Sequence, residues 1–384
     1  MSEVTLKDLD LREIFSQFEI DAEFIFHEHL KVGHINDTFL VEAQGRRGKD
    51  SFIFQRINRH VFPEPEKLMA NFEKITRHIR AKLEKTPGRD PERETVNLVG
   101  ARSGRCFHLT PEGDYWRAYR FVGHTHIVNV AGGPGQAFEA GRAFGCFQRL
   151  LADLPASSLH ETIPFFHHTP RRLARFKKAL ARDPRGRAAE AGEAIAFVLE
   201  REGMAPVVTD ALDRGIIPLR IAHNDTKINN ILFDNQTEKA ICVIDLDTTM
   251  PGSALYDFGD MVRTTTSQAA EDEQDLSRVK LEMDMFCALA DGYLGETFDF
   301  LTDREAGLLV FSGRLITYTI GLRFLTDYLE GDVYFRTNRR SQNLDRAKTQ
   351  FALIKSMEEK EGEMEACIRS LRKKGKGLGS PRRA

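Results

Sequence analysis

The chain has 384 residues, of which 41% are hydrophobic and 29% charged, and its formal net charge is -2. This composition is typical of a globular protein and excludes wholesale disorder, while the small net charge excludes a general attraction to nucleic acid or to anionic membranes. The length exceeds what one compact core usually holds, so it predicts two subdomains.

No apolar run is long enough to span a bilayer, and the first eleven residues lack the apolar segment of a signal peptide. We therefore expect a cytoplasmic protein with no nucleic-acid or membrane partner. The cysteines are odd in number and widely scattered, which favours reduced thiols over disulfides or zinc. They are Cys106, Cys146, Cys242, Cys287 and Cys367.

The first third of the sequence predicts a small lobe of strands and helices. Apolar spacing near 3.6 residues indicates a helix, and short runs rich in β-branched and aromatic residues between turn residues indicate strands. The predicted helices are 6–18 and 65–84, and the predicted strands are 24–31, 38–43, 51–57, 96–101 and 115–122.

A loop rich in glycine follows at 123–136, and long helical patterns then dominate, interrupted by a strand-rich segment at 219–248. The predicted helices are 137–152, 170–181, 188–202, 206–215, 276–295, 303–330 and 343–371. We therefore expect a small lobe at 1–122, a hinge and linker at 123–136, a larger lobe at 137–371, and a basic, disordered tail at 372–384.

One stretch carries the chemistry. His223 and Asp225 begin an H-x-D-x-x-x-x-N pattern that ends at Asn230, and a predicted strand after a short hairpin ends at Asp245. This is the arrangement of a kinase catalytic loop. Asp225 would accept the proton of an acceptor hydroxyl, while Asn230 and Asp245 would approach one Mg²⁺ from two sides.

Three neighbouring residues allow further interpretations. Lys227, two residues after the predicted base, could offset negative charge on the transferring phosphoryl group. Asp247 is interpreted equally well as a second metal ligand or as a solvent-facing residue. His223 is interpreted as a hydrogen-bonding residue that orients the loop.

Several segments resemble the bacterial N-acetylhexosamine 1-kinases, within the aminoglycoside phosphotransferase and choline kinase superfamily. They occur in the expected order across about residues 30 to 355. They are GHINDTFL (33–40), FQRIN (54–58), AGRAFGCFQRL (140–150), ETIPFFH (161–167), HNDTKINN (223–230), DLDTTMPG (245–252), DFGD (257–260), LRFLTDYLEGDVYF (322–335) and NLDRAKTQ (343–350).

The resemblance implies an α+β, protein-kinase-like bilobal fold, with an antiparallel sheet in the small N-terminal lobe and a larger, mainly helical C-terminal lobe. It also implies ATP and Mg²⁺ as cofactors and transfer of phosphate to the anomeric hydroxyl of GlcNAc or GalNAc, giving the sugar 1-phosphate. Asp225, Asn230 and Asp245 match the family's catalytic and metal positions, and Asp257 and Asp260 resemble residues that brace the catalytic loop.

The predicted nucleotide site departs from the usual kinase pattern. Gly33 and His34 stand where a glycine-rich phosphate loop belongs, but this segment has one glycine and could be a plain turn. The strand at 51–57 offers Gln55 or Arg56 in place of the usual lysine, and alternation allows only one of them to face the nucleotide. Arg56 could clamp phosphates, with Glu73 as a candidate ion-pair partner.

For the acceptor, the sequence singles out Arg323 and Asp327 on a predicted helix, with Tyr334, His34 and Asn36 as further candidates. Arg323 could bind a sugar hydroxyl or N-acetyl group, or simply pair with Asp327 four residues later. Tyr334 could stack under a pyranose ring.

Two other functions remain open at this stage. A kinase for an aminoglycoside or amino alcohol would need carboxylates around a cationic acceptor, and Asp327, Glu330 and Asp332 could supply them. A catalytically silent nucleotide-binding protein would explain the missing lysine but not an intact set of Asp225, Asn230 and Asp245. The oligomeric state stays open.

Overall fold

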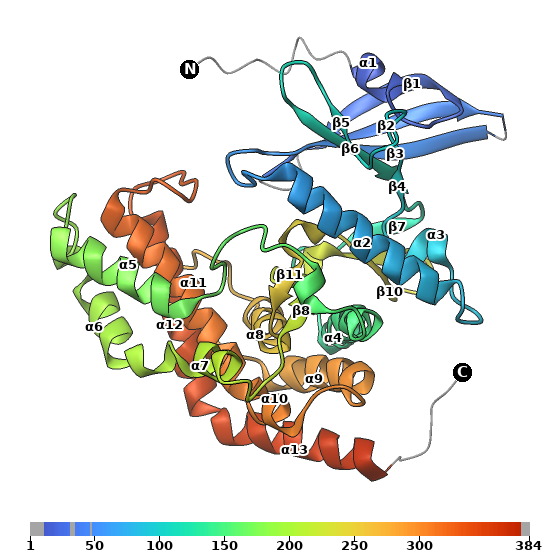
Figure 1. The fold of residues 1–384 in the computed structure, drawn as a ribbon. Helices are drawn as coiled ribbons and strands as arrows, with labels where there is room; N and C mark the ends of the chain where they lie inside the picture. Colours follow the sequence, from blue (N-terminus) through green and yellow to red (C-terminus); the bar gives the residue numbers. More distant parts are fainter. Residues whose placement is uncertain (1–10, 31–34, 47, 378–384) are drawn as a thin grey trace. The chain divides into compact units, whose positions relative to one another are not determined.

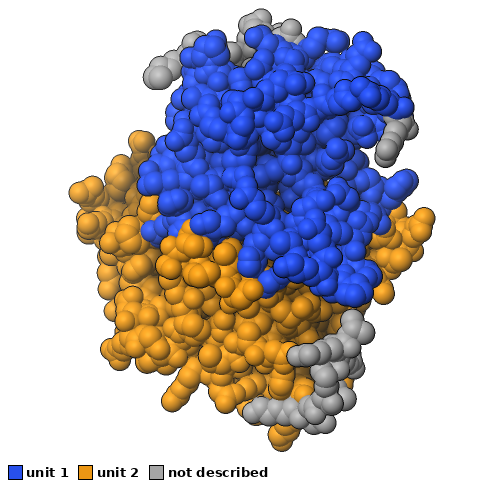
Figure 2. All heavy atoms as spheres, turned by 45° about the vertical axis from the view of Figure 1, so that its right-hand side comes forward, with its two compact units in different colours: residues 1–125, 159–163 blue, residues 126–158, 164–384 orange. Residues whose placement is uncertain are grey.

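The computed structural model describes residues 11–30, 35–46 and 48–377. The chain forms two compact units, which Figure 2 shows in different colours. Unit 1 contains residues 1–125 and 159–163, and unit 2 contains residues 126–158 and 164–384. The mixed α/β composition, with an antiparallel sheet in unit 1 and a mainly helical unit 2, confirms the expected fold class.

The short segment 159–163 belongs to unit 1, although the sequence placed it in the second lobe. Asn71 holds it by two hydrogen bonds to the backbone of His160, donating from Nδ2 to the carbonyl oxygen at 2.7 Å and accepting from the N–H at 2.8 Å. Ile163 packs against the apolar cluster around Phe62 and Leu68. These contacts join residues far apart in sequence, so no local pattern reveals them.

Unit 1 is built on an antiparallel sheet with the strand order β1-β2-β3-β6-β4, and β5 pairs with β6 (Figure 1). Phe15 and Phe18 pack on one face against Phe54 and Trp116. The elements are α1 (Leu11–Ser16), β1 (Ala22–Leu30), β2 (Asp37–Gly45), β3 (Gly48–Arg56), α2 (Pro65–Leu83), α3 (Pro91–Glu94), β4 (Leu98–Val99), β5 (His108–Leu109) and β6 (Tyr115–Arg120).

Helix α2 begins at Pro65, as a proline in the first turn predicts. Leu68, Phe72, Ile75 and Ile79 are all buried, which confirms the predicted apolar stripe. The strands predicted at 38–43, 51–57 and 115–122 agree with β2, β3 and β6 to within a few residues, whereas β4 is much shorter than the strand expected at 96–101. The helix predicted at 6–18 and the strand predicted at 24–31 agree with α1 and β1 where the structure describes them, and residues 6–10 and 31 lie outside the described residues. Helix α3 and strand β5 were not predicted.

Unit 2 is mainly helical (Figure 1). Its helices are α4 (Pro134–Leu151), α5 (Thr169–Arg182), α6 (Gly192–Glu200), α7 (Val207–Asp213), α8 (Ala254–Thr265), α9 (Met283–Thr297), α10 (Asp303–Gly307), α11 (Leu309–Glu330), α12 (Gln342–Glu359) and α13 (Glu361–Gly377). Its strands are β8 (Arg220–Ala222), β9 (Ile231–Asp234), β10 (Ala240–Val243) and β11 (Met250–Gly252), and β7 (Thr125–Ile127) pairs with β9.

Several features of unit 2 differ from the sequence predictions. The helices predicted at 303–330 and 343–371 are each divided in two, at Leu308 and at Lys360, and the helix predicted at 276–295 begins only at Met283. Helix α8 was not predicted, and Asp257 and Asp260 on it were identified only through the resemblance. Helix α13 continues to Gly377, so 372–377 is helical and not part of a disordered tail, while 378–384 lies outside the described residues. Cys287, on α9, and Cys367, on α13, lie side by side with their Cα atoms 6.1 Å apart, a proximity that their distance in sequence did not suggest.

Helices α4 and α9 approach so closely that only glycine fits at their crossing. A Cβ atom on Gly141 would lie 2.1 Å from the carbonyl oxygen of Leu289, and one on Gly292 would lie 2.1 Å from that of Phe138. Because these obstacles are backbone atoms, they cannot move aside without separating the two helices.

We expect Gly141→Ala to lower the free energy of unfolding by about 1–3 kcal/mol, the usual cost of overpacking a core. Urea unfolding followed by circular dichroism would measure this change. Gly135→Ala is the matched control, because a Cβ atom on Gly135, in the first turn of the same helix, meets nothing within 4 Å. Equal stability of the two variants would contradict the close crossing.

None of the helices in the described parts of the chain combines the length and apolar character needed to cross a membrane.

Candidate active site

The predicted catalytic loop lies between β8 and β9, and the segment after β10 returns beside it. Strand β11 pairs with β8 in antiparallel register, Met250 opposite Ala222. The N–H of Ile244 also donates to the carbonyl oxygen of Asn230 at 2.9 Å. Local pairing therefore brings Asp225, Asn230 and Asp245 into one region of unit 2.

Asp257, on α8, anchors the start of the loop. Its carboxylate is fully buried and accepts hydrogen bonds from the backbone N–H of His223 at 2.9 Å and of Asn224 at 2.7 Å. The side-chain amide of Gln148, on α4, donates to it at 2.7 Å. Burial raises the pKa of Asp257, while these hydrogen bonds and the nearby His223 oppose the increase.

Asp260, one turn later on α8, holds the middle of the loop. It accepts from the backbone N–H of Thr226 at 2.9 Å, and its other oxygen pairs with the buried Arg263 at 2.8 Å. The Thr226 hydroxyl donates to the carbonyl oxygen of Asp257 at 2.7 Å. Asp257 and Asp260 thus fix the loop backbone at His223, Asn224 and Thr226, while their own carboxylates stay buried.

His223 connects the loop to the segment before Asp245. Its Nε2 lies 2.9 Å from the carbonyl oxygen of Ile244. A carbonyl oxygen only accepts, so Nε2 carries the proton and Nδ1 can accept from the N–H of Asp225 at 3.3 Å. The imidazole is a hydrogen-bonding bridge, as its sequence interpretation proposed.

Asp225 lies between a cation and an amide. Lys227 places Nζ 3.1 Å from one carboxylate oxygen, and Asn230 donates from Nδ2 to the other at 3.1 Å and to the Asp225 carbonyl oxygen at 2.8 Å. Burial alone would raise the pKa of Asp225, but the charge of Lys227, together with its hydrogen bond and the more distant charge of Arg263, lowers it below its ordinary value. The carboxylate is therefore ionised at neutral pH.

The oxygens that could hold Mg²⁺ fit its preference for hard ligands. Because the amide nitrogen of Asn230 is directed to Asp225, its amide oxygen makes no hydrogen bond within the described residues. Asp245 is exposed and has a left-handed backbone, with φ 59°. Asp247 is buried, which does not fit its interpretation as a solvent-facing residue.

In unit 1, the expected ion pair between Arg56 and Glu73 does not form. Arg56 donates to Asp37 at 2.7 and 2.9 Å and to Asp114 at 3.4 Å. Glu73 instead pairs with Arg77, four residues later on the same helix. Gln55 and Arg56 are adjacent on β3, and adjacent residues of a strand point to opposite faces of the sheet. The Arg56 side chain therefore lies on the face opposite to that of Gln55.

Gln55 contacts a residue that the sequence interpretation missed. Arg117, on β6 opposite Gln55, donates to the Gln55 amide oxygen at 2.7 and 2.9 Å. The Arg117 guanidinium lies 4.5 Å from the ring centroid of Phe72, on α2. Arg117 is 1% exposed, so a buried cation lies between the sheet and α2, where kinases place a lysine–glutamate pair.

Two other predicted nucleotide residues, Gly33 and His34, lie outside the described residues. Asn36 is at the end of the same segment, and its side-chain oxygen accepts from the N–H of Asn58 at 3.0 Å. Asn36 thus connects the segment before β2 to the end of β3 within unit 1.

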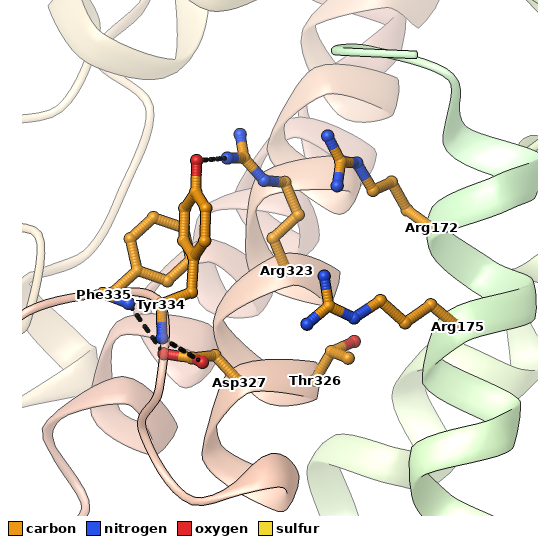
Figure 3. Close-up of a pocket in the computed structure, with 7 residues that line it drawn as sticks. All are labelled: Arg172, Arg175, Arg323, Thr326, Asp327, Tyr334 and Phe335. Carbon is orange, nitrogen blue, oxygen red and sulfur yellow. Dashed lines mark hydrogen bonds between the residues drawn. The ribbon is translucent and has the colours of Figure 1, made fainter. Parts of the chain in front are cut away.

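The predicted acceptor residues of unit 2 line one pocket between α5, α11 and the segment after α11 (Figure 3). Arg323 and Asp327 do not pair with each other. Arg323 lies 5.6 Å from the ring centroid of Tyr334 and 3.5 Å from its hydroxyl. Asp327 instead accepts from the backbone N–H groups of residues 333–335 at 2.8–3.0 Å.

His167 is a second residue that sequence reasoning missed as part of the site. It is buried, and its Nε2 donates to the carbonyl oxygen of Asn224, next to Asp225, at 2.9 Å. Burial lowers the pKa of His167 to about 4, so the ring is neutral at pH 7. The Phe166 ring contacts the His167 ring edge-to-face, and the Arg323 guanidinium lies 5.4 Å from the Phe166 ring centroid. This contact path connects the pocket to the catalytic loop, and only the three-dimensional structure reveals it.

Comparison with solved structures supports the fold. A microcompartment-associated aminopropanol kinase has a TM-score of 0.55 at 17% identity, over 92% of this chain and 97% of that one. An aminoglycoside phosphotransferase from Alicyclobacillus acidocaldarius has a TM-score of 0.56 at 12% identity, over 96% and 97%. The GDP complex of aminoglycoside 2'-phosphotransferase-IIIa has a TM-score of 0.56 at 14% identity, over 88% and 96%.

These likenesses concern the fold, because the sequence identities are low. The sequence itself assigns the family. The family model described as the phosphotransferase enzyme family matches residues 28–282, which include the whole catalytic loop and its anchoring helix α8. The chain therefore belongs to the phosphotransferase enzyme family.

Proposed function

We propose that this phosphotransferase moves the γ-phosphoryl group of ATP to the anomeric hydroxyl of an N-acetylhexosamine, GlcNAc or GalNAc, and releases ADP and the sugar 1-phosphate. The observation that carries the kinase chemistry is the ionised Asp225 held between Lys227 and Asn230 on an anchored loop. The choice of sugar rests on the resemblance to N-acetylhexosamine 1-kinases.

In this proposal, Asp225 accepts the proton of the acceptor hydroxyl as the new oxygen–phosphorus bond forms and the bond to ADP breaks. The raised pKa of Lys227, caused by the Asp225 charge, keeps its ammonium group charged and available beside the phosphoryl group. The catalytic contribution is mainly positioning and electrostatics, as in other phosphoryl transfers.

The amide oxygen of Asn230 and the carboxylate of Asp245 would hold Mg²⁺, with Asp247 as a further candidate. The ion supplies positive charge to the phosphate oxygens when bound. Asn230 is oriented for this role by its hydrogen bonds to Asp225.

Unit 1 is proposed to bind the nucleotide. Gly33, His34 and Arg56 are the candidate phosphate contacts from the sequence. Since Asp37 and Asp114 already engage Arg56, it would have to share its guanidinium with them. A cytoplasmic location, where ATP is available, is part of the proposal.

The charges around the acceptor pocket disfavour the cationic alternative. Of the three carboxylates that could attract an amino alcohol or aminoglycoside, Asp327 is bound to backbone N–H groups, Glu330 pairs with Arg175, and Asp332 pairs with Arg187. Arginine side chains line the pocket in their place. A silent nucleotide-binding protein is also disfavoured, because it would need no ordered set of Asp225, Asn230 and Lys227.

The direct test is ATP consumption with Mg²⁺ in the presence of GlcNAc, GalNAc, glucose, choline or an aminoglycoside, with products located by ³¹P NMR. An acid-labile 1-phosphate of an N-acetylhexosamine is the expected product. Phosphorylation of choline or of the aminoglycoside alone would refute the sugar proposal, and no product with any acceptor would favour the silent protein.

Lys227→Met tests the electrostatics of the base. Because the Lys227 charge lowers the pKa of Asp225, its removal should raise that pKa. A protonated Asp225 cannot accept a proton, so activity falls as pH decreases through this pKa. The acidic limb of the kcat/KM profile should therefore move to higher pH in the variant. Lys178→Met, an exposed change on α5, should leave the limb in place, and an unmoved limb in Lys227→Met would contradict the proposed coupling.

A further inference from the structure

The pocket beside α11 is lined by three arginine side chains from two helices. Arg172 and Arg175 come from α5 and Arg323 comes from α11, with Tyr334 and Phe335 on the opposite side. In Figure 3, Arg172 and Arg175 extend from α5 towards α11, and the Arg323 guanidinium is directed to the Tyr334 hydroxyl. The free volume is about 30 Å³, and a cavity needs roughly 10–15 Å³ to hold one water. The pocket therefore fits a group of a few atoms rather than a whole sugar.

Only one of these arginines has a carboxylate partner. Arg175 pairs with both oxygens of Glu330, at 2.5 and 3.0 Å. Arg172 and Arg323 form no ion pair with any carboxylate of the described residues. Arg172 donates once, to the carbonyl oxygen of Phe166 at 3.2 Å, and its Nε is buried without a hydrogen-bond partner.

Asp327 does not neutralise this charge by a direct contact. Both of its oxygens are occupied by the backbone N–H groups of residues 333–335, and the amide of Asn343 donates to one of them at 2.9 Å. Asp327 therefore shapes the pocket wall, while the guanidinium donors of Arg172 and Arg323 remain available to a ligand.

Burial lowers the pKa of both arginines without carboxylate partners. Burial, followed by the charge of Arg323, lowers the pKa of Arg172 to about 10, and burial lowers the pKa of Arg323 as well. Both groups are still protonated at neutral pH. Arg172 and Arg323 are half-buried cations without a carboxylate partner, and an oxyanion between them would neutralise their charge through charge-assisted hydrogen bonds.

The pocket is connected to the catalytic loop by direct contacts. Phe166 contacts both Arg323 and His167, and His167 donates to the carbonyl oxygen of Asn224, next to the proposed base Asp225. A group held in the pocket would therefore belong to the acceptor rather than to a remote ligand.

We propose that this pocket is an oxyanion subsite, so that the preferred acceptor is an N-acetylhexosamine that carries a carboxylate or a phosphate group away from its anomeric carbon. This inference rests on the proposed function and narrows its substrate class. Arg172 and Arg323 hold the oxyanion, the aromatic wall covers it, and the anomeric hydroxyl is left for Asp225.

The subsite can first be tested without turnover. Binding of inorganic phosphate is measured by isothermal titration calorimetry at constant ionic strength, with Mg²⁺ and a saturating non-hydrolysable ATP analogue present. Arg172→Gln should weaken phosphate binding at least tenfold. Lys178→Gln, which removes the same charge from the exposed face of the same helix, should not. Equal binding by the two variants, or no phosphate binding by the parent protein, would overturn the subsite.

Kinetics then identify the source of the oxyanion. The acceptors are GlcNAc, GlcNAc 6-phosphate and N-acetylglucosaminuronic acid. We expect kcat/KM for at least one charged sugar to exceed that for GlcNAc at least tenfold, and Arg172→Gln to abolish this preference. A preference for neutral GlcNAc that is unchanged in Arg172→Gln would refute the inference but keep the kinase. Failure of all three sugars would refute the proposed function, while the phosphate titration would still decide whether the pocket binds an oxyanion.

Discussion

Asp225→Asn is expected to lower kcat by about 10²–10⁴-fold, the usual contribution of a positioned general base. Asparagine has nearly the same shape as aspartate but cannot accept the hydroxyl proton. The loop should keep its position, because Asp257 and Asp260 hold it through the backbone at His223, Asn224 and Thr226. Nucleotide affinity should therefore change little.

Single-turnover kinetics, which follow formation of the phosphorylated acceptor, would measure the effect on the chemical step. Calorimetric titration with ADP and Mg²⁺ would measure the effect on nucleotide affinity. Asp210→Asn is a suitable control, because Asp210 lies on the surface helix α7 and its ion pair with Arg214 is long, at 3.9 Å. If Asp225→Asn turned over within a few-fold of the parent protein, Asp225 could not be the base.

Asp257→Ala is expected to reduce both stability and activity. It would leave two backbone N–H groups and the Gln148 amide without their acceptor inside the protein. Each buried unsatisfied donor costs about 1–3 kcal/mol, so we expect a loss of at least 3 kcal/mol of unfolding free energy. The start of the catalytic loop would also lose its fixed position, and kcat should fall with it.

Denaturant unfolding would measure the stability of Asp257→Ala, and activity assays well below its unfolding midpoint would measure the catalytic effect. Asp210→Ala again provides the matched control, with an expected change below 1 kcal/mol because an exposed ion pair contributes little. A near-normal stability of Asp257→Ala would contradict its role as the loop anchor.

The sequence predicted those parts of the site that local spacing determines. Asp225, Asn230 and Asp245 are separated by a short loop and one hairpin, so the strand pattern alone brings them together. The bracing by Asp257 and Asp260, inferred from the resemblance, agrees with their hydrogen bonds to the loop.

Local sequence patterns could not predict the contacts between segments that are distant in the sequence. The pairing of Arg56 with Asp37 and Asp114 depends on the register of the sheet, whereas Glu73 looked like a partner only because it lies on the next helix. His167 is 57 residues from the Asn224 backbone that it contacts. Arg172 lines the pocket because α5 packs beside α11, and its sequence neighbours give no sign of that.

The Asp327 carboxylate has a consequence for the thermodynamics of acceptor binding. By holding the backbone of residues 333–335, it fixes the wall that carries Tyr334, although that side chain is 58% exposed. Ordering a loose segment costs roughly 1–2 kcal/mol per residue in backbone conformational entropy. Since this segment is already ordered, an acceptor would meet a preorganised surface, and its association should resemble lock-and-key binding rather than induced fit.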